Sequence, residues 1–382
     1  MLYFIGLMSG TSLDGVDGVL AEQVDASAAG QGADSPPLQS RGHVHRPFPP
    51  GLRDELLALN HSGSNELHRA ALAANGLVRV YAEVVAQLLQ QGRLQSQRVT
   101  AIGAHGQTVR HQPGSFDGTG YTLQLINGAL LAELTGISVV CDFRSRDVAA
   151  GGQGAPLVPA FHAAAFRKPG QTRAVLNLGG IANLTLLQAD GGVQGFDTGP
   201  ANVLMDLWCQ RHTGQPLDKG GQWAAAGQVD EALLTKWLTD RYFALAPPKS
   251  TGRDHFNAPW LDVQLEDGAA RQPVDVMSTL AALTARSVAA ALRSSAPDAQ
   301  ALFVCGGGAH NDHLLALLGA ELNGVEVAST ATLGVAPDQV EALAFAWLAR
   351  ACLAREAGNV PAVTGARAAR VLGAIYPAGW MQ

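Results

Sequence analysis

The stretch GLMSGTSLDGVD, residues 6–17, lies between the apolar runs YFIGLM and VDGVLAE. Glycine, serine and aspartate are turn formers, so this pattern predicts a strand, a tight turn and a second strand. A turn of this kind exposes several backbone N–H groups on one side, and its hydroxyl side chains add further donors. These donors suit phosphate oxygens, and Asp14 and Asp17 are candidate ligands for Mg²⁺. An ordinary hairpin turn is the alternative interpretation.

The second half of the chain repeats this pattern. NLGGIANLT, residues 177–185, places Gly179 and Gly180 between the apolar runs AVLNL and IANLTLL. Two hairpins in equivalent positions predict a duplicated mixed-sheet fold with a cleft between the halves. Elsewhere strand-like and helix-like runs alternate, which favours α/β layers. A hairpin with a Gly-Gly turn and no ligand remains the alternative for this segment.

The length of 382 residues indicates two domains. The Gly-rich, Pro-terminated stretch RSRDVAAGGQGAP is the best candidate for a crossing between them. We therefore expect a first lobe over residues 1–150, a second lobe over 151–354, and a last segment, 355–382, that returns to complete the first. The small polar residues 25–40 predict a flexible hairpin loop.

Apolar spacing predicts where the main helices lie. They are expected at residues 52–60, 65–91, 128–134, 278–294, 311–318 and 338–354, and a further helix is expected to begin near Asn202.

Composition excludes several classes of protein. Hydrophobic residues make up 47% and charged residues 15%, which is typical of a globular chain. Apolar runs are strand-length or broken by charge, and the N-terminus has no basic region before its apolar run, so we expect a soluble, cytoplasmic protein. The net charge of −6 disfavours a nucleic-acid partner.

The cysteine and lysine residues limit the kinds of site that the chain could form. The four cysteines show no CxxC spacing, so we expect ordinary buried thiols. Lysine is scarce, and the chain has neither a GxxxxGK[ST] segment nor the motifs of a protein kinase. A nucleotide enzyme with this sequence must hold phosphates with backbone N–H groups, hydroxyls, arginine and metal.

A candidate general base lies in GFDTGPAN, residues 195–202. Asp197 stands at the end of a predicted strand, before the Gly-Pro part of a DTGP turn that opens a helix. Ligands bind at such strand ends in α/β sheets, and a carboxylate there is suited to take up a proton. Alternatively, Asp197 organises only the turn and the start of the helix.

Two motifs in the first half carry polar side chains that suit a sugar. In AHGQTVRHQP, residues 104–113, His105, Gln107 and Thr108 offer hydrogen bonds to hydroxyl groups. A lone histidine is more often structural. In DFRSRDVA, Arg144 and Arg146 are suited to bind a carboxylate with two parallel hydrogen bonds. A surface salt-bridge loop is the alternative.

Two motifs in the second half remain. VCGGGAHN, residues 304–311, reads strand, glycine turn and helix, and the bare turn would let a flat adenine or ribose lie against the backbone. Glu341 is a carboxylate on an otherwise apolar helix. Because a buried acid is costly without a partner, it either points into a polar cleft or faces solvent.

Together, and in this order, these motifs resemble the 1,6-anhydro-N-acetylmuramic acid kinase family. The resemblance runs from Gly6 to about Ala349, and its stretches are GLMSGTSLDGVD, AHGQTVRHQP, DFRSRDVAAGGQGAPLVP, LNLGGIANLT, GFDTGPAN, PPKSTGRDHFN, CGGGAHN and QVEALAFAWLA. It implies an α/β, two-lobed actin-like ATPase fold, with an RNase H-like mixed sheet in each lobe and ATP in the interdomain cleft.

The resemblance also implies roles for individual residues. Asp197 is expected to be the catalytic base, and the sugar is expected to meet His105, Arg144 and Glu341. On the chemistry of their side chains alone, Gln107 and Thr108 stay candidates for contact with the sugar, and Asp14 and Asp17 stay candidates for Mg²⁺. ATP is expected to meet Gly10, Thr11, Ser12, Leu13, Asp14, Gly15, Val16, Asp17, Gly179, Gly180, Asn183, Gly306, Gly307 and Gly308.

The reaction implied by the family is the opening of an intramolecular ether coupled to phosphorylation. The product would be N-acetylmuramic acid 6-phosphate, in the recycling of peptidoglycan sugars. A kinase for another sugar hydroxyl and a non-catalytic actin-like ATPase are the alternatives. We expect a small-molecule sugar and ATP as ligands, a homodimer, and no nucleic-acid or membrane partner.

Overall fold

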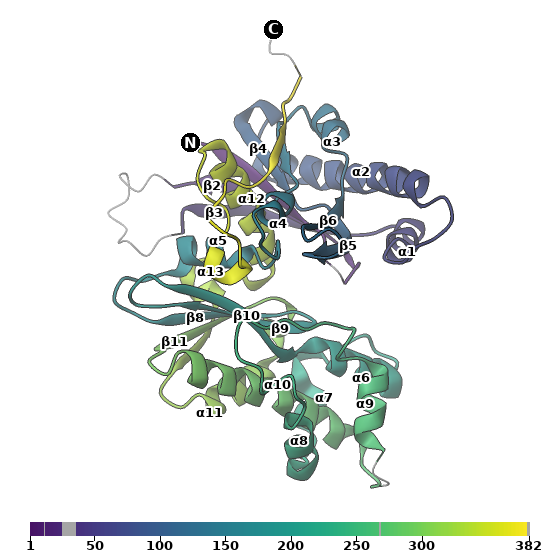
Figure 1. Cartoon of the computed structure of the whole chain (residues 1–382), viewed down its shortest axis with the longest axis vertical. Coiled ribbons are helices and arrows are strands. Elements are labelled where there is room, and N and C mark those ends of the chain that lie inside the picture. Colours follow the sequence, from purple (N-terminus) through teal and green to yellow (C-terminus); the bar gives the residue numbers. More distant parts are fainter. Residues whose placement is uncertain (11, 25–35, 267–268, 380–382) are drawn as a thin grey trace. The chain divides into compact units, whose positions relative to one another are not determined.

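The structure is a computed structural model of the chain, and it describes residues 1–10, 12–24, 36–266 and 269–379. The chain divides into two compact units, labelled by element in Figure 1. Unit 1 comprises Met1–Phe166 and Gln339–Gln382, and unit 2 comprises Arg167–Asp338.

Unit 1 is built on a six-stranded sheet with the order β13-β7-β4-β1-β2-β3. The strands β1, β2 and β3 run antiparallel in succession, while β4 is parallel to β1 and β7 is parallel to β4. A separate antiparallel ribbon is formed by β5 and β6. The strands are β1 Tyr3–Met8, β2 Gly15–Gln23, β3 Leu38–Pro47, β4 Val99–Ala104, β5 Gln107–Pro113, β6 Gly120–Leu125, β7 Val139–Cys141 and β13 Ala374–Tyr376.

Unit 2 repeats this sheet with the order β10-β9-β8-β11-β12. Its first three strands are again antiparallel in succession, and β11 is parallel to both β8 and β12. The two sheets therefore share one strand order and one set of directions, which is the RNase H-like arrangement. The predicted α/β fold with a mixed sheet of this type in each half is confirmed. The strands are β8 Arg173–Leu178, β9 Ile181–Leu187, β10 Val193–Pro200, β11 Ala301–Cys305 and β12 Glu326–Ser329.

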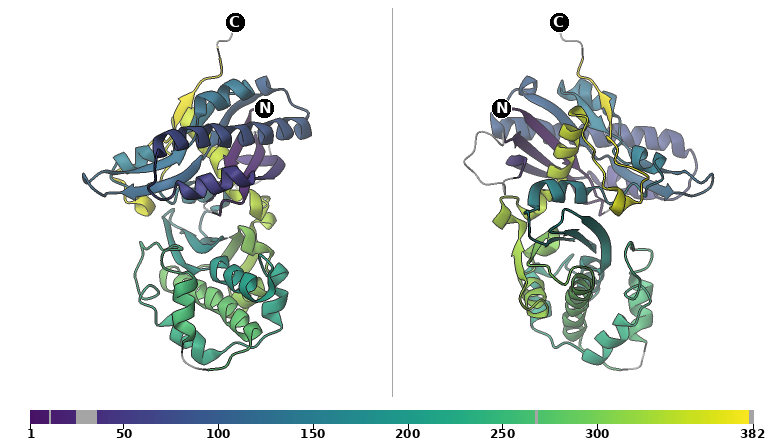
Figure 2. Two further views of the ribbon diagram at one scale, coloured as in Figure 1. Left: turned by 90° about the vertical axis from the view of Figure 1, so that its right-hand side faces the viewer. Right: turned by 60° about the vertical axis from the view of Figure 1, so that its left-hand side comes forward.

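The sheet of unit 1 is covered by helices on both faces (Figures 1 and 2). Helix α2 packs against β2 and β3, where the side chains of Val84 and Leu88 fill the space beside Gly18. Helix α12 packs on the opposite face, against β1 and β4. The helices of unit 1 are α1 Pro50–Ala58, α2 Glu66–Gly92, α3 Gly128–Thr135, α4 Ser145–Ala149, α5 Val158–Phe166, α12 Val340–Leu353 and α13 Pro361–Thr364.

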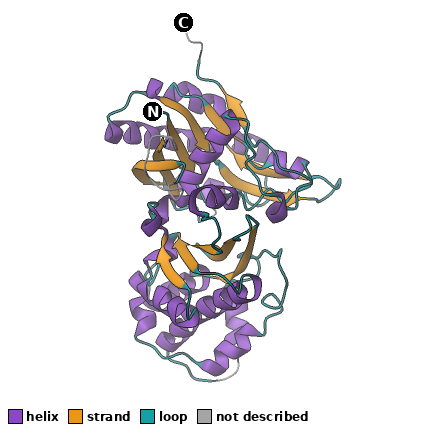
Figure 3. Ribbon diagram, turned by 90° about the vertical axis from the view of Figure 1, so that its left-hand side faces the viewer, coloured by secondary structure: helices purple, strands orange, loops and turns teal. Residues whose placement is uncertain are grey.

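The helices of unit 2 gather on one side of its sheet (Figure 3). Helix α10 is central, because it contacts β9 and β10 as well as α6, α7, α8 and α11. The helices are α6 Asn202–Thr213, α7 Gln222–Ala225, α8 Glu231–Leu238, α9 Ala258–Leu265, α10 Pro273–Ser295 and α11 Asp312–Glu321. Short 3-10 helices in the chain cover Ser96–Arg98, Lys219–Gly221, Gly307–His310, Thr330–Leu333 and Pro337–Gln339.

Helices α2 and α10 are long and apolar enough to cross a membrane by length and composition alone. Both nevertheless serve as core helices, because 50% of the apolar window of α2 and 78% of that of α10 are buried within the protein. The four cysteines are buried and none of them forms a disulfide bond, as predicted.

Several sequence-based assignments need correction. The predicted DTGP turn is part of β10, where Asp197 pairs with Asn183 and Pro200 pairs with Ile181. Residues 38–40 of the predicted loop belong to β3, and residues 25–35 of that loop lie outside the described residues. The predicted interdomain stretch contains helix α4.

The bounds of the two units also differ from the predicted lobes. Residues 151–166 belong to unit 1 because α5 packs on α12. Residues 340–353 belong to unit 1 because α12 packs on β1 and β4.

The contact between α12 and its sheet is made by backbone atoms. A Cβ atom on Gly6 would overlap the carbonyl oxygen of Ala342, and one on Gly103 would overlap the carbonyl oxygen of Phe345. These two glycines are paired across β1 and β4, so together they form one flat site for the helix. Protein interiors are packed too tightly to accept an added methyl group at such a contact.

Gly6→Ala or Gly103→Ala should therefore displace α12 and lower the free energy of unfolding by about 3 kcal/mol. Urea titration followed by circular dichroism measures this change. Gly51→Ala is the matched control, because the space around Gly51 on α1 is open. If the Gly6 and Gly103 variants were as stable as the control, the close packing of α12 would be wrong.

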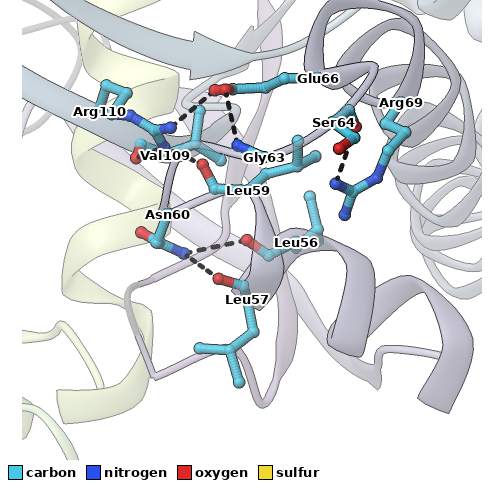
Figure 4. A network of polar contacts seen from close by, with 10 residues as sticks. All are labelled: Leu56, Leu57, Leu59, Asn60, Gly63, Ser64, Glu66, Arg69, Val109 and Arg110. Atoms are coloured by element: carbon cyan, nitrogen blue, oxygen red, sulfur yellow. Dashed lines mark hydrogen bonds and ion pairs between the residues drawn. The ribbon is translucent and has the colours of Figure 1, made fainter.

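A network of polar contacts holds the connection between α1 and α2 (Figure 4). Arg110 on β5 donates a hydrogen bond of 2.7 Å to Glu66 at the start of α2, and a second one to the backbone oxygen of Leu59. Asn60 donates to the carbonyl oxygen of Leu56 at 2.9 Å, which closes the end of α1. The ribbon β5–β6 is thereby tied to the two helices that precede it.

Candidate active site

The predicted site residues follow the carboxyl ends of the parallel strands in each unit. In unit 1, the turn that contains Gly10 follows β1, His105 follows β4 and Arg144 comes shortly after β7. In unit 2, Gly179 follows β8 and Gly306 follows β11. Ligands bind at this edge in open α/β sheets, so each unit presents its polar groups where its topology favours binding.

In unit 1, His105 and Arg144 form a fixed pair. Arg144 donates from Nη2 and Nε to His105 Nε2 at 2.9 and 3.2 Å, and from Nη1 to the carbonyl oxygen of Gly154 at 2.8 Å. A guanidinium group only donates, so Nε2 must accept. His105 Nδ1 therefore carries the proton and donates to the backbone oxygen of Ser9 at 3.1 Å.

The charge state of His105 follows from its surroundings. Burial, together with the positive charge of Arg144, lowers the pKa of His105 to about 3. The imidazole is therefore neutral at physiological pH, and its only acceptor atom is already used by Arg144. Consequently His105 is not available as an acid or base, and its role is to orient the guanidinium group.

Arg144 remains a cation in spite of its burial. Burial lowers the pKa of Arg144, and the charges of Glu341 and Asp147 partly oppose this effect. The resulting pKa is about 10. Burial raises the pKa of Glu341, Arg144 opposes the rise, and the charges of Asp17 and Asp14 add to it. Glu341 is half-buried, and it lies close enough to Arg144 for the two charges to interact.

The first hairpin turn is shaped by contacts to its neighbours. Ser9 Oγ lies 2.8 Å from the hydroxyl of Tyr81 and donates to the backbone oxygen of Gly106 at 3.0 Å. Gln107 Nε2 donates to the backbone oxygen of Gly10 at 3.0 Å. Apart from the nearby Ser12, the space around Gly10 is open, so a ligand could approach its backbone.

Other predicted members of this turn have structural roles. Leu13 is buried with a positive φ of 56°, while Gly15 and Val16 belong to β2. A Cβ atom on Gly15 would overlap the carbonyl oxygen of Arg46 on β3. Thr11 lies outside the described residues.

The predicted magnesium ligands Asp14 and Asp17 each have a hydrogen-bond partner. Ser12 donates to Asp14 Oδ1 at 2.8 Å. His43 Nε2 and His45 Nδ1 lie 3.0 and 3.1 Å from Asp17 Oδ1. The described part of the chain holds no group of three or more acidic, histidine or cysteine residues suited to a metal. Two carboxylates nevertheless fit Mg²⁺, which commonly takes one or two carboxylates together with substrate phosphates and water.

In unit 2, both oxygens of the Asp197 carboxylate are held. Oδ1 accepts from Asn183 Nδ2 at 2.8 Å, and Oδ2 accepts from the backbone N–H of Thr251 at 3.0 Å. The backbone of Asp197 is fixed as well, by bonds to Lys249 O and from the hydroxyl of Tyr242. Burial raises the pKa of Asp197, whereas Asn183 and Thr251 lower it. The result is a rigid carboxylate with raised basicity, suited to take up a proton.

The second hairpin turn is anchored to helix α6. The backbone oxygens of Gly179 and Gly180 accept hydrogen bonds from the N–H groups of Asn202 and Ala201, each at 3.0 Å. The nearest atom to a Cβ on Gly179 would lie 3.8 Å away, so a ligand could approach this turn.

The glycine turn after β11 lies beside the end of β8. A Cβ atom on Gly306 would overlap the side chain of Asn177, and one on Gly308 would lie 2.5 Å from Leu178 Cβ. Gly306 and Gly308 are therefore needed for packing, while the space around Gly307 is open. Unit 2 thus brings this turn close to the second hairpin turn.

Two residues that were predicted to meet ligands form hydrogen bonds within the protein. Thr108 accepts a hydrogen bond from Gln124 on the neighbouring strand β6. Asn183, predicted to meet ATP, donates to Asp197.

Sequence reasoning missed other residues altogether. Asp147 is fully buried and accepts hydrogen bonds from Gly154 N and Thr364 Oγ1, each at 2.8 Å, so it fixes the loop that holds Arg144. Thr251 belongs to the stretch PPKSTGRDHFN, which contributed to the family resemblance but to which the sequence analysis assigned no role.

Comparisons with known proteins show the family of this chain. A family model described as "Anhydro-N-acetylmuramic acid kinase" matches residues 2–378. The chain belongs to this family. The anhydro-N-acetylmuramic acid kinase of Variovorax paradoxus (strain S110) is 60% identical over 98% of this chain and 99% of its own length. The protein of the same name from Bordetella petrii is 61% identical over 98% of this chain and 96% of its own.

The predicted family is therefore confirmed, as is the prediction that the chain is an enzyme of this kind. Among solved structures, the activator of 2-hydroxyisocaproyl-CoA dehydratase from Clostridium difficile aligns with a TM-score of 0.42 and 12% identity, over 90% of this chain and 93% of that one. The strand order of the two sheets is what identifies the fold.

The state of His105 is directly measurable. Because its pKa is lowered to about 3, the ring should keep the Nδ1–H form from pH 8 to pH 5, as read from ¹⁵N shifts in NMR spectra. The unfolded chain takes up a proton near pH 6.5 and the folded chain does not, so stability should fall as the pH drops below 6.5. A ring that titrates near pH 6.5 in the folded protein would contradict the pairing with Arg144.

Proposed function

We propose that this chain is an ATP-dependent kinase that opens the 1,6-anhydro ring of anhydro-N-acetylmuramic acid and phosphorylates O6. The observation that carries the proposal is the Asp197 carboxylate, held through both oxygens and partly withdrawn from solvent. The substrate class is supported by the names of relatives that are about 60% identical over nearly the whole chain.

In the proposed reaction, Asp197 takes a proton from a water molecule, and the water oxygen attacks C1 of the sugar. The bond between C1 and O6 breaks, and O6 forms a new bond to the γ-phosphorus of ATP. The bond between that phosphorus and the bridging oxygen of ADP breaks. The products are N-acetylmuramic acid 6-phosphate and ADP, and the proton remains with Asp197 until it is released to solvent.

Residues of unit 1 would recognise the sugar. The remaining N–H groups of Arg144 are suited to a carboxylate, such as that of the lactyl group of the substrate. His105 and the backbone oxygen of Gly154 hold the guanidinium group, so its side chain would lose little conformational freedom when the sugar binds. Glu341 offers its carboxyl group to a hydroxyl or amide of the sugar.

Backbone N–H groups of the two hairpin turns would hold the phosphates of ATP. When bound, Mg²⁺ would neutralise charge on the phosphate oxygens, and Asp14 and Asp17 would hold it. The backbone around Gly307 would accept the adenosine, since no side chain covers it. The proposed place of the reaction is the cytoplasmic recycling of peptidoglycan sugars.

Asp197→Asn tests the proposed base. Because an amide does not take up the proton, turnover should fall on the order of 10³-fold while ATP binding is kept. Sugar-dependent release of ADP measures turnover, and titration calorimetry with a non-hydrolysable ATP analogue measures binding. Asp262→Asn is the control, because Asp262 pairs with Arg211 at an exposed position of unit 2. A turnover near that of the wild type would refute the assignment.

Asn183→Ala tests how the base is tuned. Without the hydrogen bond from Asn183, the ionised form of Asp197 is less favoured and its pKa rises. The acidic limb of the profile of kcat/KM against pH should therefore move up by about 0.5–1 pH unit. An unchanged profile with a raised KM for ATP would instead place Asn183 against the nucleotide.

A further inference from the structure

The stretch PPKSTGRDHFN, residues 247–257, contains an arginine that the proposed reaction does not use. Arg253 is exposed, and its Nη2 lies 4.0 Å from the position that a Cβ atom on Gly180 would take. The guanidinium group therefore stands beside the glycine turn between β8 and β9. Both residues belong to unit 2.

The segment that carries Arg253 is anchored to the proposed base. The N–H group of Asp197 donates to Lys249 O at 3.1 Å, and the N–H group of Thr251 donates to Asp197 Oδ2 at 3.0 Å. On the other side, Asn257 donates to the backbone oxygen of Arg253 at 3.1 Å and caps helix α9. The backbone of Arg253 is thus fixed at both ends relative to the carboxylate.

The guanidinium group of Arg253 lies near one carboxylate but is not paired with it. The half-buried carboxylate of Asp206 on α6 lies close enough to Arg253 for the two charges to interact. Burial raises the pKa of Asp206, Arg253 partly opposes the rise, and the resulting pKa is about 6. Among the described residues, however, the guanidinium group forms no ion pair and no hydrogen bond. Its N–H donors remain available to an anion.

Other cations of this region are occupied. Lys249 donates to the carbonyl oxygens of Tyr242 and Phe243 at 3.2 and 3.4 Å, with its ammonium group over the Tyr242 ring. Lys236 donates to Gln264 O. Among the residues that the structure describes, Arg253 is therefore a cation beside the glycine turn that has no acceptor of its own.

We propose that Arg253 is a catalytic residue that contacts the γ-phosphoryl group of ATP during its transfer. Charge is spread over the three outer oxygens of a transferring phosphoryl group, and the planar fork of an arginine matches two of them. This inference rests on the proposed function, because it assigns the phosphoryl donor of that reaction to the turn at Gly180. It predicts that Arg253 distinguishes a nucleoside triphosphate from a diphosphate.

The test compares Arg253→Gln with the wild-type full-length chain in two assays. Calorimetry with Mg²⁺ measures affinity for ADP and for the non-hydrolysable triphosphate AMP-PNP. Steady-state kinetics with the anhydro sugar measure kcat and both KM values. Arg211→Gln is the matched control, because it removes the same charge from an exposed ion pair at the far end of α6.

We expect Arg253→Gln to lower kcat by about 10²–10³-fold. It should weaken AMP-PNP binding by about tenfold and leave ADP binding within about twofold. Arg253→Lys should restore only part of kcat, since an ammonium group lacks the fork. The control should behave as the wild type in both assays.

Three results would overturn the inference. They are a wild-type kcat, an equal loss of ADP and AMP-PNP affinity, and a change confined to the KM of the sugar. If Arg253→Gln did not fold, Arg253→Lys would be compared in the same way. A wild-type protein with no sugar-dependent turnover would refute the proposed function instead, and the comparison of AMP-PNP with ADP would still test Arg253.

Discussion

The arrangement of unit 1 depends on the direct contact of helix α12 with strands β1 and β4. Gly6 and Gly103 allow the helix backbone to lie on the sheet, and Phe345 on the same helix packs against the ring of His105 with 4.8 Å between ring centroids. The first turn of α12 carries Glu341. One packing contact therefore positions both the carboxylate and the imidazole, and through the imidazole the guanidinium group of Arg144.

Both units use buried polar groups that are held before any ligand arrives. In unit 1, the neutral ring of His105 accepts from Arg144, and the fully buried Asp147 holds the loop that supplies the second acceptor. In unit 2, Asn183 and Thr251 hold the Asp197 carboxylate. Burying these groups would be costly if they lacked partners. Because they are paired, the cost is offset, and the geometry that the proposed reaction requires of these groups is fixed in advance.

The local sequence was sufficient to predict structural features that depend on residues close together in the chain. The turn at Gly179 and Gly180, with apolar runs on both sides, predicted a hairpin, and the repeat of this pattern predicted the duplicated sheet. Contacts between distant residues could not be predicted in this way. The tautomer of His105 is set by an arginine 39 residues away. Similarly, the requirement for glycine at position 6 comes from a helix near the other end of the chain.

In the proposed reaction, one enzyme couples the opening of the ether to transfer of the phosphoryl group. The most direct measurement is a reaction with Mg-ATP and 1,6-anhydro-N-acetylmuramic acid in ¹⁸O-water, read by mass spectrometry. Coupled ether opening and phosphoryl transfer should give a phosphorylated sugar that carries one ¹⁸O, at C1. Phosphorylation of a different sugar without the label would contradict the ether-opening reaction, and ADP release that does not depend on sugar would contradict the kinase itself.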